Sequence, residues 1–249
     1  MDVPLSAPAS FFPSDMHVAL IDVDIKEELR RRPFRAPDYE AEHRALLQLA
    51  QAMAETPSEV LQKLIDITCE VCRAHTAGLS LLEMHHGEEL FRWVTVAGRY
   101  ASCRNSTMPR NASPCGTTVD RNVSQLLYRP ERAFPALKAD PPVVEALLLP
   151  FSMNGKTIGT IWVVAHDETR KFDAEDERLV TTLAQFAAAA WQLWAARTAS
   201  ESAQRELEEK VMELEAFHDV VVGRELKMIE LEKEVERLRT EKVTCACTK

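Results

Sequence analysis

Cys115 is the residue of this chain best suited to covalent chemistry. It lies in the run Ser113-Pro114-Cys115-Gly116-Thr117, which we place just before or at a helix N-terminus. There, the helix dipole and the free backbone amides would lower the pKa of a thiol and make it a better nucleophile. The alternative is a structural or ligand-adjacent cysteine that packs as a small apolar group, and this is the interpretation we prefer.

The other cysteines do not predict a metal centre. Cys69 and Cys72 form a C-x-x-C pair inside a predicted helix, and no second pair follows at the spacing of a zinc site. Cys245 and Cys247 lie in the C-terminal tail, which we expect to be too mobile to complete a tetrahedral site. We therefore predict no metal, and the sequence identifies no cofactor.

Composition indicates an ordinary folded protein and argues against two classes of partner. Of the 249 residues, 46% are apolar, which is enough for one core of ordinary size. The net charge of −9 and the lack of an extended basic patch argue against binding of nucleic acid or of an anionic membrane. No apolar run approaches the ~20 residues of a transmembrane helix, and the first residues do not resemble a signal peptide. We expect a cytoplasmic protein whose six cysteines are mostly reduced.

The N-terminal part predicts an arm and two helices. Residues 1–38 are rich in proline, with a candidate strand at HVALIDVDI (17–25), and we interpret them as an arm ordered by docking on a partner. From Tyr39, apolar residues recur at the spacing of an amphipathic helix. The run Thr56-Pro57-Ser58-Glu59 supplies an N-cap, a proline at the first helical position and a glutamate at the third, so a second helix begins there.

Two hairpins and a long helix are predicted further along the chain. AGLSLLEM and ELFRWVTVAG flank residues 85–88 and form the first hairpin. Two apolar runs flank Asn154-Gly155, a dipeptide that tolerates the positive φ of a tight turn, and form the second. Asp173 is then a helix N-cap with Asp176 in the first turn. The helix that follows should cover the sheet with Leu179, Leu183, Phe186, Ala190 and Leu193.

The segment between Gly98 and Pro142 is the expected location of the binding site. Prolines break it repeatedly, and only CGTTVDRN and SQLLY predict a helical turn and a short strand. A long structured crossover of this kind normally covers a pocket over the sheet and carries binding groups. The candidate ligand-binding residues are Arg110, Asn111, Cys115 and Thr117 on the crossover, Trp93 on the second strand and Trp162 on the last strand.

After Arg197 the sequence becomes mostly charged, and residues 199–249 predict a coiled coil. Apolar positions alternate at spacings of four and three in two blocks, Leu207, Val211, Leu214, His218 and Val221, then Met228, Leu231, Val235 and Leu238. The second block is out of phase with the first, and Gly223 at the break predicts a hinge. Charged residues beside a narrow seam favour pairing between chains over packing on the same domain, so we predict a homodimer.

The second hairpin and its helix resemble the closing half of a GAF domain. The matching residues are Leu149-Pro150, Asn154-Gly155-Lys156, Ile158-Gly159-Thr160, Phe172, Asp176 and Glu177. The resemblance covers about residues 40–198, and MPRNASPCGTTVDRN and PPVVEALLLPF are similar to the N-terminal GAF modules of bacterial sensor histidine kinases. It implies an α+β fold in which a central antiparallel sheet is flanked by helices and followed by a long C-terminal coiled-coil helix.

The resemblance implies ligand sensing without naming a ligand. GAF domains bind cyclic nucleotides, linear tetrapyrroles, haem, small acids or nothing. Cys115 is similar to the chromophore cysteine of phytochrome-like GAF domains, which a histidine typically follows, whereas Gly116 follows it here. It is also similar to the Cys-Gly of free methionine-(R)-sulfoxide reductases, whose further cysteines before the last hairpin are missing here. Asp176 belongs to half of a cyclic-nucleotide motif, and we interpret it first as a helix-start and packing residue.

His218 lies where a kinase phosphoacceptor could lie, on a helix of a predicted coiled coil. Its flanking residues do not match the L-R-x-P-L that follows the histidine of dimerisation and phosphotransfer helices, and no nucleotide-binding boxes follow in this sequence. We therefore interpret residues 199–249 as a signalling helix of the kind that links a sensor to a kinase.

Together these features predict a sensor without catalysis, built from an arm (1–38), a GAF sensory domain (39–198) and a signalling helix (199–249). A small ligand under the crossover would change the packing under Phe186 and Trp191, and the helix would carry that change. The expected partners are a second copy of the chain and a histidine kinase or another signalling protein. Two alternatives stay open: a thiol-dependent reductase or redox sensor using Cys115, and a ligand-free dimerisation scaffold.

Overall fold

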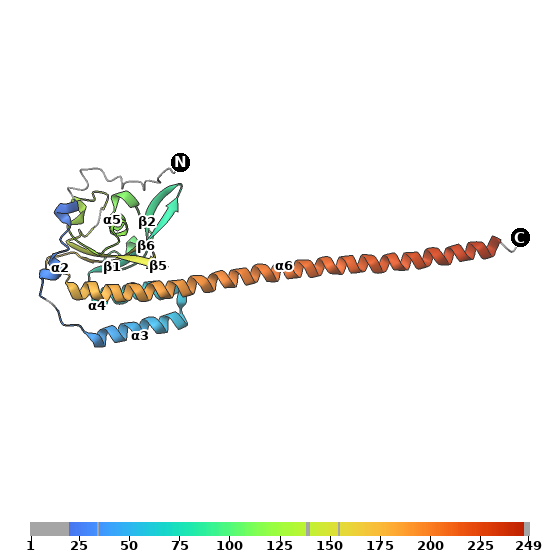
Figure 1. Cartoon of the computed structure of the whole chain (residues 1–249), viewed down its shortest axis with the longest axis horizontal. Helices are drawn as coiled ribbons and strands as arrows, with labels where there is room; N and C mark the ends of the chain where they lie inside the picture. Colours follow the sequence, from blue (N-terminus) through green and yellow to red (C-terminus); the bar gives the residue numbers. More distant parts are fainter. Residues whose placement is uncertain (1–19, 34, 138–139, 154, 247–249) are drawn as a thin grey trace, which may run out of the picture. The chain divides into compact units, whose positions relative to one another are not determined.

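The computed structural model describes residues 20–33, 35–137, 140–153 and 155–246. The chain divides into two compact units, Met1–Trp194 and Ala195–Lys249. The first unit contains the sheet and the helices that cover it, and the described part of the second is the C-terminal portion of one long helix (Figure 1).

A six-stranded sheet of order β3-β2-β1-β6-β5-β4 forms the centre of the first unit. Its strands are β1 (Thr76–His85), β2 (Glu88–Gly98), β3 (Thr107–Pro109), β4 (Gln125–Tyr128), β5 (Glu145–Met153) and β6 (Lys156–Ala165). All five neighbouring pairs are antiparallel. Both predicted hairpins are present, and Gly155 adopts a φ of +75° at the second turn, as a tight turn requires, while Asn154 lies outside the described residues. The predicted antiparallel α+β fold is confirmed.

Helices cover both faces of this sheet. α3 (Tyr39–Glu55), α4 (Val60–Val71) and the first part of α6 (Ala174–Ala246) lie on one face, and α5 (Pro114–Arg121) lies on the other (Figure 1). The helix predicted from Thr56 begins with a 3₁₀ turn, η1 (Pro57–Glu59), before α4. The sheet is therefore buried on both sides by two separate apolar cores.

The two cores contain side chains from opposite faces of the strands. The first core lies between the sheet and α3, α4 and α6, and includes Leu64, Leu79 and Val180. The second core lies between the sheet and the crossover, and includes Phe134, Leu148 and Trp162. Successive strand residues point to opposite faces, so Ile161 and Val163 belong to the first core while Trp162 and Val164 belong to the second.

The crossover from Gly98 to Pro142 is built from short elements. They are η2 (Ala101–Cys103), β3, η3 (Arg110–Ala112), α5, β4 and η4 (Pro130–Arg132). α5 and β4 match the predicted helical turn and strand, whereas β3 was not predicted because three residues carry too little periodicity. Ser113 caps α5 by accepting a hydrogen bond from the Gly116 amide at 3.1 Å.

The start of α6 agrees with its predicted cap. Asp173 Oδ1 accepts hydrogen bonds from the amides of Glu175 and Asp176, both at 3.0 Å. Leu179 and Leu183 are buried as predicted, but the side chain of Leu193 is 64% exposed. The prediction for Leu193 was wrong because the helix has passed the edge of the first core by that residue.

The described part of the N-terminal arm belongs to the fold of the first unit. Residues 20–23 are helical, so the strand predicted at 17–25 was wrong in its described part, and only Asp24 forms a single bridge with Leu127. A second short helix, α2 (Glu28–Arg31), follows. Leu20 and Val23 lie in the second core and Leu29 in the first, so this segment packs on its own domain. Burial of these side chains overrode the strand-like composition.

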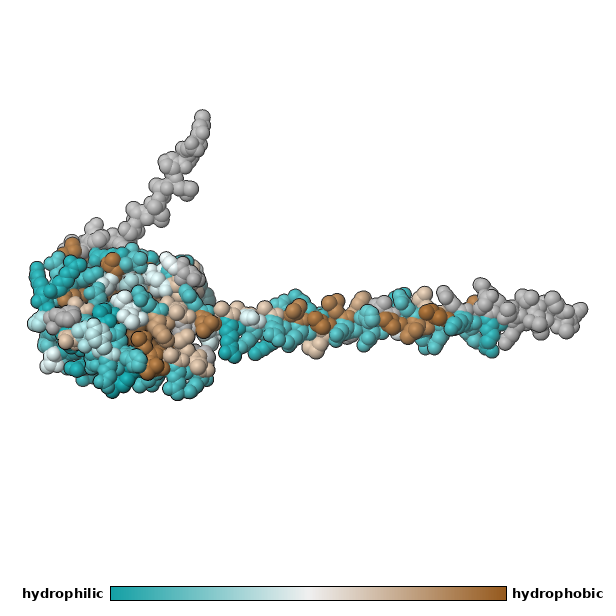
Figure 2. Space-filling model, turned by 60° about the horizontal axis from the view of Figure 1, so that its bottom comes forward, coloured by the Kyte–Doolittle hydropathy of each residue, from teal (hydrophilic) through white to brown (hydrophobic). Residues whose placement is uncertain are grey.

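The second unit is helical throughout its described residues, and α6 runs through Gly223 without a break. Large apolar side chains are exposed along it, including Leu207, Leu214, Met228 and Leu231 of the predicted seam. Figure 2 shows hydrophobic side chains gathered along this helix. Among the described residues, no helix is long and apolar enough to span a membrane.

Candidate functional site

A small cavity lies in the second core, between the sheet and the crossover. Its volume is about 40 Å³. Trp93 of β2, Ala146 of β5 and Trp162 of β6 form its sheet side, while the crossover side includes Tyr100 and Cys115. The cavity is therefore where the sequence placed the ligand site, under the crossover and over the sheet.

Three aromatic rings form one wall of this cavity. The centroid of the Trp93 ring lies 5.1 Å from that of Trp162 and 6.4 Å from that of Tyr100. The Trp162 Nε1 donates a hydrogen bond of 2.8 Å to Ser80 Oγ on β1. Gly78 makes this ring position possible, because a Cβ there would lie 2.2 Å from Trp162 Cζ2. The wall is thus fixed by packing and by a buried hydrogen bond.

Cys115 lies in the first turn of α5, as predicted, but its thiol is not activated. The residue is only 5% exposed, and burial raises the pKa of the Cys115 thiol. The nearby hydroxyls of Thr160 and Ser80 act in the opposite direction and are outweighed. The expected lowering of the pKa was wrong, because loss of hydration at a buried thiol exceeds the effect of the dipole of an eight-residue helix.

The structure brings three of the six candidate ligand-binding residues to the cavity. Trp93, Cys115 and Trp162 line it. Arg110 instead forms ion pairs with Glu89 and Asp120. Asn111 is exposed on η3.

Thr117 is buried in a local hydrogen-bond network beside the cavity. Its hydroxyl lies 2.8 Å from Gln125 Oε1 and 2.9 Å from the Pro114 carbonyl. Thr118 makes the same pair of contacts. These threonines hold α5 to β4, so Thr117 supports the crossover and does not line the cavity.

A histidine and tyrosine cluster beside the cavity was not predicted. His166 Nε2 lies 2.8 Å from Thr76 Oγ1, and its Nδ1 lies 3.0 Å from the Pro142 carbonyl. The ring of Tyr100, which lines the cavity, contacts the His166 ring edge-on at 4.6 Å. These residues come from four separate segments, so spacing in the sequence carried no signal for them.

Acidification is expected to destabilise the protein through His166. Burial lowers the pKa of His166, and Arg99 and His75 act in the same direction, whereas the Pro142 carbonyl and Asp167 oppose it. The unfolded chain therefore binds a proton at His166 more readily than the folded protein does. The stability that neutral His166 contributes is complete above the pKa of an unfolded histidine, and it is lost as the pH falls from that pKa toward the lower pKa of the folded protein. The urea midpoint should therefore fall more steeply with decreasing pH in the wild type than in His166→Asn. Equal pH dependence of the two proteins would contradict this role.

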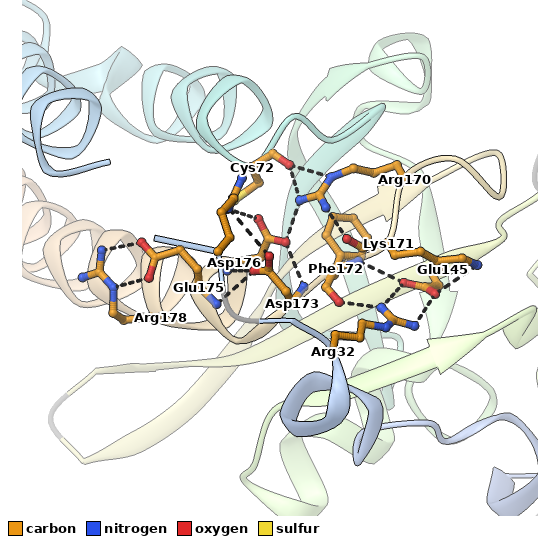
Figure 3. Close-up of polar contacts among 11 residues, drawn as sticks. Arg32, Cys72, Glu145, Arg170, Lys171, Phe172, Asp173, Glu175, Asp176 and Arg178 are labelled. Atoms are coloured by element: carbon orange, nitrogen blue, oxygen red, sulfur yellow. Dashed lines mark hydrogen bonds and ion pairs between the residues drawn. The ribbon is translucent and has the colours of Figure 1, made fainter. Parts of the chain in front are cut away.

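A network of buried ion pairs ties the N-terminal segment to β5 and to α6 (Figure 3). Arg32 donates to both carboxylate oxygens of Glu145, at 2.9 and 2.8 Å, and the Glu145 side chain is fully buried. Glu145 also accepts from the Phe172 amide at 3.1 Å. The Arg32 guanidinium donates to the Phe172 carbonyl as well. One arginine thus joins three segments that are far apart in the sequence.

Asp176 is the second centre of this network. Its carboxylate pairs with Arg35 at 2.7 Å and with Arg170 at 2.6 Å, and its side chain is fully buried. Arg170 also donates to the carbonyl of Cys72 at the end of α4. The predicted packing role of Asp176 at the helix start agrees with this position, because its carboxylate fixes the first turn of α6 to neighbouring segments.

The cavity and α6 lie on opposite faces of the sheet. Phe186 packs on the first core, so it does not line the cavity, and the Trp191 side chain lies outside the described part of the structure. A direct contact links the crossover to α6 instead: Ser124, before β4, donates a hydrogen bond to Glu177 in the first turn of α6. A structural change in the crossover can therefore reach α6 around the edge of the sheet.

A larger hollow on the surface is a weaker candidate. It has a volume of about 660 Å³ between α3, α4 and β2 and is lined by polar side chains such as Gln48, Gln62 and Lys63. Charged side chains of both signs line it, including Glu59 and Arg104. We place the candidate site in the apolar cavity of the second core, because a small ligand gains most from apolar burial.

Cys115 should resist alkylation in the folded protein. Its burial and raised pKa leave little accessible thiolate near neutral pH, whereas Cys103 is only partly buried. Under brief iodoacetamide treatment, mass mapping should show modified Cys103 and unmodified Cys115, and both should react after denaturation. Native alkylation of Cys115 at the rate of Cys103 would contradict a structural role.

Within the described residues, no group of three histidine, cysteine, aspartate or glutamate side chains is arranged to hold a metal ion. The cavity wall also offers no cationic or anionic side chain for a charged cofactor.

Comparison with known proteins places this fold in a family. A family model of the GAF domain matches residues 54–192. No curated protein matches the chain.

Solved structures share the fold at low sequence identity. The GAF domain of a phosphoenolpyruvate-protein phosphotransferase from Coxiella burnetii aligns with a TM-score of 0.54 and 20% identity, over 66% of this chain and 99% of that one. The corresponding Acinetobacter domain gives 0.53 and 13%, over 65% and 97%. Free methionine-R-sulfoxide reductase from Neisseria meningitidis, solved with its substrate, gives 0.50 and 18%, over 67% and 97%. At these identities the similarity shows the fold and not the ligand.

Proposed function

The chain belongs to the GAF domain family, and from this membership we propose that it is a cytoplasmic sensor that binds a small ligand and signals through a dimeric coiled coil. The observation that supports ligand binding best is the cavity between sheet and crossover, with its wall of Trp93, Trp162 and Tyr100. Mostly apolar hollows lined by aromatic side chains are the usual sites of small ligands. In this proposal the chain carries out no catalysis of its own.

The exposed seam of the second unit supports dimerisation. Leu207 and Leu214 are 63% and 67% exposed, and Met228 and Leu231 are 52% and 57% exposed. Apolar residues spaced alternately by four and three along a charged helix are typical of a coiled coil, in which a second chain covers them. We propose a parallel homodimer through residues 199–249, and a histidine kinase or another signalling protein as its downstream partner.

The signal would pass from the crossover to the first turn of α6. A ligand that moves the crossover would act on the Ser124–Glu177 hydrogen bond, and through residues 24 and 25 on the N-terminal segment. That segment holds Asp176 through Arg35. In this proposal, the route around the edge of the sheet takes the place of the expected change in packing under Phe186, which does not line the cavity. Further along α6, the phase break at Gly223 would allow the coiled-coil seam to change register.

A thiol-dependent reductase is the second candidate function. It is favoured by Cys115-Gly116 at the cavity and by the shared fold of a reductase that acts on free methionine sulfoxide. The raised pKa and burial of Cys115 argue against it. Replacing Cys115 with serine should abolish turnover of an oxidised substrate if the chain is a reductase, and should leave dimerisation unchanged in either case.

Hydrogen exchange of the full chain, with and without a small-molecule extract of its own cells, tests the proposal. Ligand binding should protect amides in residues 98–137 and change exchange in residues 199–246. Ser124→Ala should keep the first effect and weaken the second. Protection confined to the crossover would refute transmission, and no change in either region would refute sensing.

A further inference from the structure

The wall of the cavity presents only apolar atoms to a ligand. Two polar atoms of its aromatic residues are used elsewhere: Trp162 Nε1 donates to Ser80 Oγ, and the Tyr100 hydroxyl donates to the Pro141 carbonyl. The Cys115 thiol lies beside the hydroxyls of Ser80 and Thr160. A ligand in the cavity would therefore meet mainly ring faces and alkyl groups.

The cavity is also too apolar to hold water well. A buried water molecule needs two to four polar partners, and cavities lined by apolar groups stay dry and accept benzene or xenon instead. A volume of about 40 Å³ is close to that of one small apolar group. Filling it recovers contacts that the lining atoms otherwise lack.

Charge in this cavity would be unfavourable. A buried carboxylate, phosphate or ammonium needs a counter-charge or several hydrogen bonds, and the wall supplies neither. Burial raises the pKa of Tyr100, and Cys103, Glu131 and Asp140 act in the same direction, but none of these three residues lines the cavity. Recognition by charge is thus absent from the part of the site that is described.

We propose that the ligand of this GAF domain is uncharged and apolar, and that a small apolar molecule or the apolar end of a larger one inserts beside Trp93 and Trp162. This rests on the proposed sensory function and adds the chemical class of the ligand. Ala146 sets the depth of the cavity, because its methyl group forms part of the sheet side opposite the crossover. The ring of Trp93 is only partly buried, so it limits the size of the ligand at the outer edge.

Matched small-molecule probes test the chemical class of the ligand directly on the full chain. Xenon fits the cavity by size and can be followed by quenching of tryptophan fluorescence. Toluene, benzoate and benzylamine share one ring and differ in the group that could enter a cavity of about 40 Å³, which is a methyl group, a carboxylate or an aminomethyl group. Their binding can be measured by calorimetry. We expect saturable binding of xenon or toluene, and binding of benzoate and benzylamine weaker than that of toluene by at least about 100-fold.

Two variants locate the binding. Ala146→Leu should fill the cavity and abolish the response to the apolar probes, whereas Ala50→Leu adds the same group on the exposed face of α3 and should change nothing. If Ala146→Leu fails to fold, Trp93→Leu provides the opposite test, because a larger cavity should bind toluene more tightly.

The outcomes separate the ligand class from the function. Binding of benzoate or benzylamine as tightly as toluene, or no binding of either apolar probe, overturns the apolar class. If the purified protein still carries a noncovalent small molecule in that case, the sensory function stands with another ligand chemistry. If it carries none and no probe binds, both proposals fail.

Discussion

Replacing Glu145 with alanine should destabilise the first unit by about 3–5 kcal/mol, the range for removing one partner of a buried ion pair. The Glu145 side chain is fully buried and holds Arg32 through two hydrogen bonds, together with the Phe172 amide. Without it, the Phe172 amide loses its acceptor and the Arg32 guanidinium keeps only the Phe172 carbonyl, in a site that water reaches poorly. Since whole domains are stable by only about 5–15 kcal/mol, urea unfolding should show a large loss.

Glu168→Ala is the matched control. Lys171 pairs with Glu145 at 3.3 Å and with the carboxylate of Glu168, but the Glu168 side chain is 53% exposed. An exposed ion pair contributes at most about 1 kcal/mol, so this variant should unfold nearly like the wild type. Equal effects of the two substitutions would mean that the buried network does not hold the N-terminal segment and α6 in place.

Replacing Leu231 with glutamate should weaken the homodimer by about 1,000-fold. In a symmetric coiled coil each of two chains would lose about 2 kcal/mol of leucine burial, and ~1.4 kcal/mol corresponds to a tenfold change in Kd. Leu226→Glu is the matched control. Leu231 and Leu226 are 57% and 59% exposed in the single chain, but only Leu231 lies on the predicted seam.

Sedimentation equilibrium of the full chain measures both dissociation constants. The Leu226→Glu protein should dimerise like the wild type, because glutamate suits an exposed helix position. Dissociation caused equally by both substitutions would place the interface on another face of the helix. A wild-type protein that is monomeric at every concentration would remove the coiled coil from the mechanism.

Local signals predicted most of the fold. Asn154-Gly155 marked the second hairpin because few dipeptides tolerate its turn, and Asp173 marked the start of α6 because its side chain caps free amides. Helical spacing of apolar residues located α3, α4 and α6. These features depend on residues a few positions apart, which a sequence displays directly.

Features that depend on distant residues were missed. Arg32 and Glu145 are 113 positions apart, and Tyr100 meets His166 across 66 positions, so no spacing rule could pair them. The segment 20–23 became helical because Leu20 and Val23 found a place in the second core. For Cys115, the helix terminus is a local signal, whereas the burial that raises the pKa of its thiol depends on distant residues and agrees with the packing interpretation that we preferred.

The candidate site shows the same limit. Trp93 and Trp162 were candidates because of their positions on the second and last strands, and both line the cavity. No local pattern distinguished Cys115, which lines it, from Thr117, which holds α5 to β4. Arg110 was a candidate because of its position on the crossover, but its guanidinium pairs with Glu89 and Asp120.

Native mass spectrometry of the full chain purified from its own cells, before and after mild denaturation, tests ligand-dependent signalling by a dimer most directly. We predict a complex of two chains with an added small mass that denaturation removes. A monomer would contradict signalling through the coiled coil. An added mass that stays on the denatured chain would contradict noncovalent binding and direct attention back to Cys115, and a dimer without added mass would support the ligand-free scaffold.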